Sequence, residues 1–126
     1  MFSHITVGTN NFARAAAFYD TVLATLGHQR FVSGDYHAGY GLPNGNQFWL
    51  LRPFDKAAAT PGNGNHIALL APSRNAVRTF HATALANGGS DEGVPALRPH
   101  YHANYYGAYA RDPDGNKIQA VCHRSE

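Results

Sequence analysis

The feature that most constrains this chain is an internal repeat. Residues 66–89 repeat residues 4–27, with seven of the 24 paired positions identical and a histidine opening each copy. A second similarity, at an offset of 70, pairs residues 42–46 (LPNGN) with residues 112–116 (DPDGN). Two copies are too few for a solenoid, in which many repeats stack in a row. The repeat therefore predicts two modules that fold against each other, with a shared cleft between them.

Each copy shows the same order of predicted elements: a strand, an amphipathic helix and three further strands. Apolar residues from Phe12 to Leu26 fall on one helical face and predict the first helix. Asn11 and Ser73 are the predicted N-caps, and glycines follow at both helix ends. The predicted strands are 2–8, 29–33, 36–42 and 47–52 in the first copy, and a strand from His66, then 94–98, 105–111 and 117–123 in the second.

This pattern, βαβββ twice, predicts an α+β fold in which two curved sheets form an incomplete barrel around a central cleft. At 126 residues the chain has the length of one domain, so the two modules are expected to be halves of one folding unit. We expect a single domain over residues 1–126, with modules at about 1–53 and 64–126 and a linker at 54–63.

Composition narrows the function classes. Hydrophobic residues make up 44% of the chain and charged residues 14%, which excludes a disordered chain or a coiled coil. The net charge is only +2 and no basic cluster is present, so we expect no nucleic-acid partner. No apolar run is long enough to span a membrane, and the N-terminus does not resemble a signal peptide. With Cys122 as the one cysteine, we expect a cytoplasmic protein without disulfides.

Alternation along the strands assigns residues to the two faces of each sheet. The continuously apolar face of each sheet should lie under a helix; it comprises Ile5, Val7, Ile67, Leu69, Ile118, Ala120 and Cys122. His4, His66 and Gln119 alternate with these residues. They should therefore face away from the helices, into the space that the curved sheets enclose.

Paired βαβββ modules, a histidine on the first strand of each and the motif DPDGN-x-I at 112–118 together resemble the vicinal oxygen chelate superfamily. This superfamily includes glyoxalase I, bleomycin-resistance proteins, extradiol dioxygenases and fosfomycin-resistance enzymes. The resemblance spans the whole chain, and its most specific part is the stretch 105–123. It implies a glyoxalase-like protein whose members with metal bind a divalent ion between the modules and chelate adjacent oxygens of a substrate.

By this resemblance, His4 and His66 match two metal ligands of the family, and Gln119 matches a third that is usually glutamate. The repeat sets Trp49 opposite Gln119, at the fourth ligand position. Tryptophan cannot ligate a metal through its indole N–H, so at most three protein ligands remain. Two imidazoles and an amide form an uncharged, weak site for Zn, Ni, Mn or Fe, and the alternative is that no metal binds.

Glyoxalase I, by the same resemblance, uses a metal-linked glutamate as its base. This chain has two glutamates, Glu92 and Glu126, and neither is at a ligand position. Ordinary glyoxalase I activity is therefore not expected. His102 and Tyr106, in and beside a loop rich in His and Tyr that precedes the seventh strand, are the candidates for proton transfer. The candidates for substrate contacts are Trp49, Tyr36 and Tyr105.

Two function classes remain open. One is a divalent-metal-dependent enzyme, of lyase, isomerase or dioxygenase type, that chelates adjacent oxygens of a small oxygen-rich substrate. The other is a metal-free protein that binds a small aromatic compound or drug, as in the bleomycin-resistance branch. Histidines at matching positions of the repeat favour the first class, and the missing carboxylate favours the second. The resemblance also implies a homodimer.

Each candidate residue has an ordinary structural interpretation as well. His4 and His66 could be inward-facing histidines that bind no ion, and Trp49 could be a packing residue. Tyrosines are common in strands whatever their role. Cys122 is expected to be a small buried hydrophobic residue.

Overall fold

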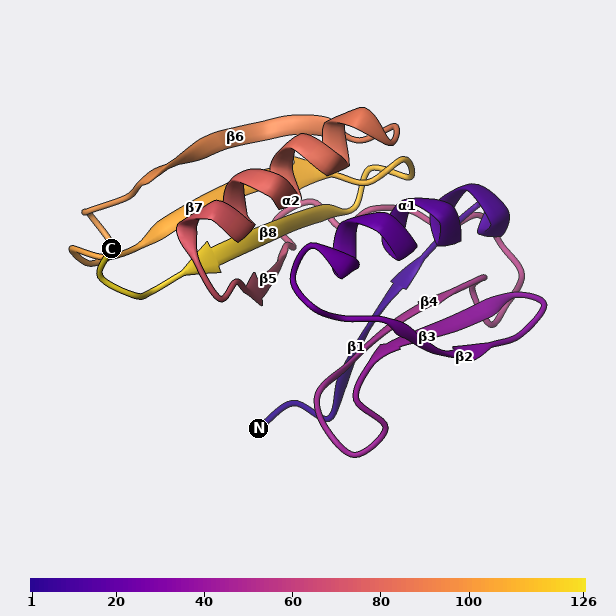
Figure 1. The fold of residues 1–126 in the computed structure, drawn as a ribbon. Coiled ribbons are helices and arrows are strands. Elements are labelled where there is room, and N and C mark those ends of the chain that lie inside the picture. The colour runs from indigo at the N-terminus through magenta and orange to yellow at the C-terminus, as the bar shows by residue number, and fades with distance from the viewer.

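The computed structural model describes all residues from Met1 to Glu126 and contains two modules of the same topology (Figure 1). The first consists of β1 (His4–Gly8), α1 (Phe12–Ala24), β2 (Arg30–Ser33), β3 (His37–Gly41) and β4 (Gln47–Leu51). The second consists of β5 (Ile67–Leu70), α2 (Arg74–Ala86), β6 (Ser90–Leu97), β7 (Tyr106–Arg111) and β8 (Lys117–Cys122). The predicted order βαβββ is confirmed in both.

Each module forms its own four-stranded sheet. The strand orders are β1-β4-β3-β2 and β5-β8-β7-β6, so the first strand of each module runs parallel to the last. The remaining pairs are antiparallel, because short turns connect them. No strand of one sheet pairs with a strand of the other. The sheets therefore do not close, which confirms the predicted incomplete barrel.

The helix ends follow local side-chain chemistry. The Asn11 side chain accepts a hydrogen bond from the Arg14 N–H, and the Ser73 side chain accepts one from the Ala76 N–H. Both predicted N-caps are thereby confirmed. After the helices the chain turns at Gly27 and Gly88, whose φ angles of 86° and 96° only glycine adopts without strain. Neither helix is long and apolar enough to span a membrane.

The hydrophobic core lies between the helices and the sheets and is continuous through both modules. The helices α1 and α2 contact each other, lying side by side in Figure 1. The apolar strand faces are positioned as predicted: Val7, Ile118, Ala120 and Cys122 are buried in the core, and Ile5, Ile67 and Leu69 pack against it.

One strand differs clearly from its prediction. The strand predicted at 94–98 is β6, which begins at Ser90 and is interrupted by register shifts around Gly93. The stretch Ser90-Asp-Glu-Gly resembles a turn in sequence. Its pairing with β7 nevertheless extends the strand, because partner strands supply hydrogen bonds that override local propensity.

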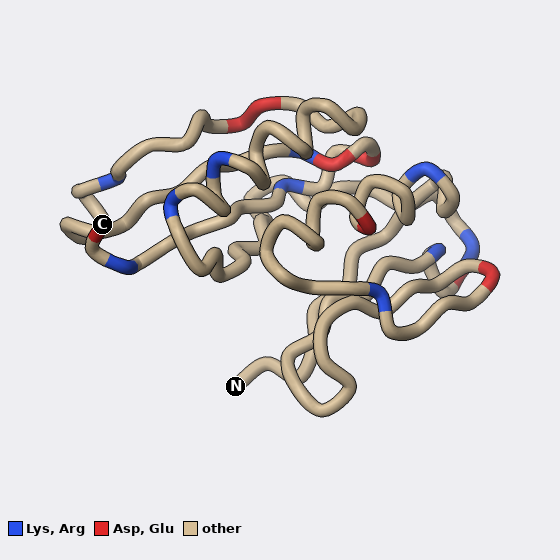
Figure 2. Tube along the Cα trace, viewed as in Figure 1, with Lys and Arg blue, Asp and Glu red and all other residues tan.

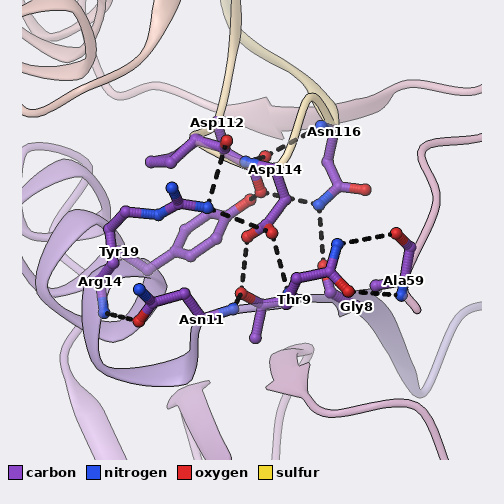
Figure 3. Close-up of polar contacts among 11 residues, drawn as sticks. Gly8, Thr9, Asn11, Arg14, Tyr19, Ala59, Asp112, Asp114 and Asn116 are labelled. Atoms are coloured by element: carbon purple, nitrogen blue, oxygen red, sulfur yellow. Dashed lines mark hydrogen bonds and ion pairs between the residues drawn. The ribbon is translucent and has the colours of Figure 1, made fainter. Parts of the chain in front are cut away.

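The modules are also joined by polar contacts from the turn between β7 and β8 (Figure 3). The Asp114 carboxylate accepts hydrogen bonds from the Thr9 hydroxyl at 2.6 Å and the Asn10 N–H at 2.9 Å. It also forms an ion pair with Arg14 at 3.4 Å. Asn116 donates from its side-chain amide to the Gly8 carbonyl at 3.0 Å. The DPDGN motif therefore acts as a clamp between the two modules.

Charged residues are spread over both modules without a large cluster of one sign (Figure 2). Several are neutralised locally, as in the ion pairs of Arg30 with Asp20 and of Arg111 with Glu92. This distribution agrees with the small net charge of +2.

Candidate functional site

His4 and His66 both line one cavity of about 550 Å³. His4 begins β1, and His66 immediately precedes β5. Both side chains are exposed, and the cavity extends to Leu23 and His28 at the end of α1. The Nδ1 atom of His4 is 2.7 Å from the Ser3 hydroxyl oxygen. The structure therefore brings the two repeated histidines to the same cavity.

Gln119 does not line that cavity. It lies on β8 opposite Ala68 and Tyr109 and is fully buried. Its side-chain amide donates to the Tyr105 hydroxyl at 2.7 Å, while its carbonyl oxygen is buried without a partner. Tyr105, a predicted substrate contact, is therefore hydrogen-bonded to Gln119, the predicted third metal ligand.

Trp49 lies on β4 opposite Thr6 and Gly39 and faces away from α1. A Cβ atom on Gly39 would lie 3.0 Å from the indole ring, so a larger residue there would require the ring to shift. The indole N–H donates to the Gln47 side-chain oxygen at 2.9 Å, which orients the ring. The rings of Phe31 and His37 pack nearby, with centroids 6.0 and 6.3 Å from that of Trp49.

Trp49 and Tyr36 share a second cavity, of about 410 Å³. It lies at the C-terminal end of β4 and the N-terminal end of β3, and it is lined by Tyr36, His37, Trp49, Leu51, Arg52, Pro53, Phe54 and Lys56. We call this the Trp49 cavity. Two of the three predicted substrate contacts therefore come together, whereas Tyr105 lies on the other module. Phe54 and Lys56, which the sequence placed in the linker, also line this cavity.

His102 and His123 form a hydrogen-bonded pair at the C-terminal end of β8. The Nε2 atom of His102 is 2.8 Å from Nδ1 of His123, and the Tyr105 ring packs against both imidazoles. The Asn104 N–H donates to Nδ1 of His102 at 3.2 Å, so that nitrogen carries no proton and Nε2 is the donor to His123. None of residues 98–105 lines either cavity.

Tyr106, the other proposed proton-transfer residue, lies on the helix-facing side of its sheet. It packs against the core, and Arg74 and Arg78 of α2 lie 5.4 and 5.9 Å from its ring centroid. Tyr109, three residues further along the same strand, pairs with Gln119 and faces the same side of the sheet as Gln119. The two tyrosines are therefore on opposite faces of the sheet.

Tyr109 was not among the predicted site residues, although strand alternation places it on the face of Gln119. Arg98 and Lys117 each lie 5.0 Å from its ring centroid, and the ring packs against His66. Burial, followed by the nearby Tyr105, raises the pKa of Tyr109 to about 12. Tyr109 is therefore protonated at neutral pH and presents a neutral hydroxyl.

The family match covers most of the chain. Residues 1–120 match the Glyoxalase/Bleomycin resistance protein/Dioxygenase superfamily. The chain belongs to this superfamily.

Solved structures agree with this membership. A glyoxalase/bleomycin resistance protein from Albidiferax ferrireducens T118 is 38% identical, with a TM-score of 0.89 over 98% of this chain and 99% of that one. A glyoxalase-related enzyme from Fulvimarina pelagi is 20% identical, with a TM-score of 0.75 over 97% and 87% of the two chains. The second likeness shows the fold alone. A search among curated proteins finds no significant match.

Members of the glyoxalase/bleomycin resistance/dioxygenase superfamily commonly bind divalent metals, but the residues of this chain do not fit such an ion. No three His, Cys, Asp or Glu side chains lie close enough to hold one. The only other predicted donor, the Gln119 oxygen, is buried away from the cavity of His4 and His66. Both glutamates are engaged elsewhere, Glu92 by Arg111 and Glu126 by the backbone N–H of Arg74.

Proposed function

We propose that this member of the superfamily is a metal-free binding protein that holds a small, flat aromatic molecule in the Trp49 cavity. The observation that carries the proposal is the position of Trp49. Trp49, whose ring cannot ligate a metal, stands at the position that the internal repeat pairs with the predicted ligand Gln119, and it lines a cavity together with Tyr36. The chain thus offers a stacking surface at that position.

The dimensions and lining of the cavity support this proposal. The cavity is a shallow depression open to solvent, and its volume of about 410 Å³ lies toward the lower end of the range of small-molecule sites, which is roughly 300–1,000 Å³. Offset or edge contacts between aromatic rings contribute about 0.5–1.5 kcal/mol beyond the burial of apolar area. Because the hydrogen bond to Gln47 already orients the indole, little side-chain entropy is lost when a ligand stacks on it.

The competing function is a metal-dependent enzyme of lyase, isomerase or dioxygenase type. It is supported by His4 and His66 at one cavity, but no carboxylate lines that cavity, and no third His, Cys, Asp or Glu lies close enough to the two histidines to complete a metal site. The two functions differ in metal content. After incubation with Zn²⁺ or Ni²⁺ and desalting, we expect the protein to retain well below one equivalent. One full equivalent, lost in the His4→Ala/His66→Ala variant, would instead establish the enzyme class.

Trp49 is the only tryptophan, so its emission reports directly on the proposed site. We expect a member of a panel of small aromatic compounds to change this emission saturably. Calorimetry should then show that Trp49→Ala weakens binding by roughly tenfold, since a stacking contact is lost, and that Trp49→Phe weakens it less. Leu97→Ala, at an exposed apolar residue outside the cavity, is the control. If no compound changes the emission, the proposal is wrong.

We also propose that the chain forms a homodimer. The edge strands β1 and β5 each have one side without a partner strand. Near them, the large apolar side chains of Phe2 and Leu70 are 72% and 71% exposed and line the same cavity. Covering such residues is a common reason for two copies to associate.

The compartment stays a prediction. Cys122 is buried and free, which fits a reducing compartment but does not require one. A cytoplasmic location is checked by fractionating cells that produce the protein.

A further inference from the structure

We infer that the ligand of the Trp49 cavity is an anion, an aromatic carboxylate, whose charged group is held by Arg52 and Lys56. This inference rests on the proposed function, because it takes the aromatic cavity as the binding site. It adds the charge of the ligand, which neither the superfamily match nor the shape of the cavity determines.

Arg52 is held at the rim of the cavity. Its guanidinium carbon lies 4.0 Å from the ring centroid of Tyr36, a close cation–π contact. Its backbone N–H donates to the Tyr36 carbonyl at 3.0 Å, so the two residues are also joined through the main chain. A guanidinium stacked by its face keeps its N–H groups free at the edge, where they match the two oxygens of a carboxylate.

Lys56 supplies the second positive charge from an unusual backbone conformation. Its φ of 62° is the only positive φ of a non-glycine residue in the chain. The Lys56 N–H closes the turn by donating to the Pro53 carbonyl at 2.9 Å. Glycine would relieve the strain of this conformation, yet the chain places a lysine there, with its side chain at the cavity.

No acidic residue pairs with either of these two cations or lines the cavity. The nearest acid in sequence, Asp55, accepts a hydrogen bond from the Ala57 N–H and is not part of the lining. Two cations beside aromatic walls, without an acid, attract an anion and disfavour a cationic ligand.

The test compares 2-naphthoate with 2-naphthamide, which has nearly the same shape but no charge, by calorimetry at low ionic strength. We expect naphthoate to bind roughly tenfold more tightly, because charge-assisted hydrogen bonds to Arg52 and Lys56 form only with the anion. Added NaCl should reduce this preference, since exposed charges are screened.

The variants assign the preference to particular residues. Arg52→Gln and Lys56→Gln should each lower naphthoate affinity severalfold and change naphthamide affinity much less, so that the ratio of the two affinities falls. Lys56→Gly removes the charge while relieving the backbone strain, so it should reproduce Lys56→Gln in a protein that folds at least as well. Arg124→Gln removes one charge from an exposed residue far from the cavity lining and should change neither affinity.

Each contrary outcome is distinct. Equal binding of the two probes overturns the anion inference and leaves the aromatic site standing. A naphthoate preference that survives both Gln variants shows that the anion binds elsewhere, which also overturns it. Failure of both probes to bind, together with unchanged Trp49 emission across the aromatic panel, overturns the proposed function as well.

Discussion

At the scale of single residues, Asp112 shows how a carboxylate can be buried in this protein without a cation. It is 4% exposed. One of its oxygens accepts from the backbone N–H groups of Asp114 and Asn116, both at 2.9 Å. The other accepts from the Tyr19 hydroxyl at 2.6 Å and the Asn116 side chain at 2.8 Å. These four bonds replace the water that the carboxylate loses on burial.

Replacing Asp112 with asparagine should therefore destabilise the fold strongly. The amide NH₂ of asparagine would face donors instead of accepting from them, which leaves buried N–H or O–H groups unpaired. We expect a loss of about 2–4 kcal/mol in the free energy of unfolding, measured by urea denaturation. Asp55→Asn, at an exposed residue with one local bond, is the matched control. A loss below about 0.5 kcal/mol for Asp112→Asn would contradict the clamp.

At the scale of elements, β6 is tied to α2 by one polar contact. His81 on α2 is 7% exposed, and its Nε2 atom is 2.8 Å from the Asp91 carboxylate on β6. The same carboxylate accepts from the Gly93 N–H at 3.0 Å, beside the irregularity of the strand. The hydrogen bond from His81, followed by that from Gly93, lowers the pKa of Asp91 below its ordinary value of 3.8.

The lowered pKa of Asp91 determines how its contribution to the free energy of unfolding changes with pH. Because the folded protein holds the proton of Asp91 less tightly than the unfolded chain does, the stabilisation is complete above pH 3.8. It is lost as the pH falls through the lowered folded-state pKa. Wild type should therefore be more stable than Asp91→Asn at pH 7, and the difference in unfolding free energy should shrink in acid. A difference that stays constant from pH 7 into acid would disprove this role.

At the scale of the whole molecule, the modules are joined by their helices and by the clamp, while the sheets stay unpaired. Two candidate sites result, one at the junction of the modules near His4 and His66 and one within the first module at Trp49. The proposed ligand contacts of the Trp49 cavity all belong to the first module. That cavity is therefore complete without the second module.

The unpaired edge strands β1 and β5, with exposed apolar residues beside them, predict that the protein is a homodimer in solution. Light scattering behind a sizing column should give a mass of twice 13.6 kDa at micromolar concentration. Leu70→Lys should shift the mass toward one chain, because a charge at a covered apolar position opposes association. Val94→Lys, at an exposed apolar residue on β6, should leave the mass unchanged. A wild-type mass of 13.6 kDa would refute the dimer.

The sequence by itself determined the repeat, the order of elements, the helix caps and the faces of the strands. These features depend on residues close together in the chain: Asn11 caps α1 through a residue three positions away, and Ile118 is buried because strand alternation has a period of two. The boundaries of most elements followed within about two residues for the same reason. The start of β6 did not, because its pairing depends on β7.

Only the tertiary structure decided how the candidate residues are grouped. Family resemblance placed His4, His66 and Gln119 in one set and the internal repeat set Trp49 opposite Gln119, but these residues divide between two cavities and a buried position. The tertiary structure also places the DPDGN motif of the second module as a clamp on the first. It brings Arg52 and Lys56, whose positive charges have no acidic partner in an ion pair, to an aromatic cavity. The clamp and the cavity of His4 and His66 depend on how two modules far apart in the chain pack together, and the Trp49 cavity depends on how β3, β4 and the segment after β4 fold together. No local sequence pattern encodes either arrangement.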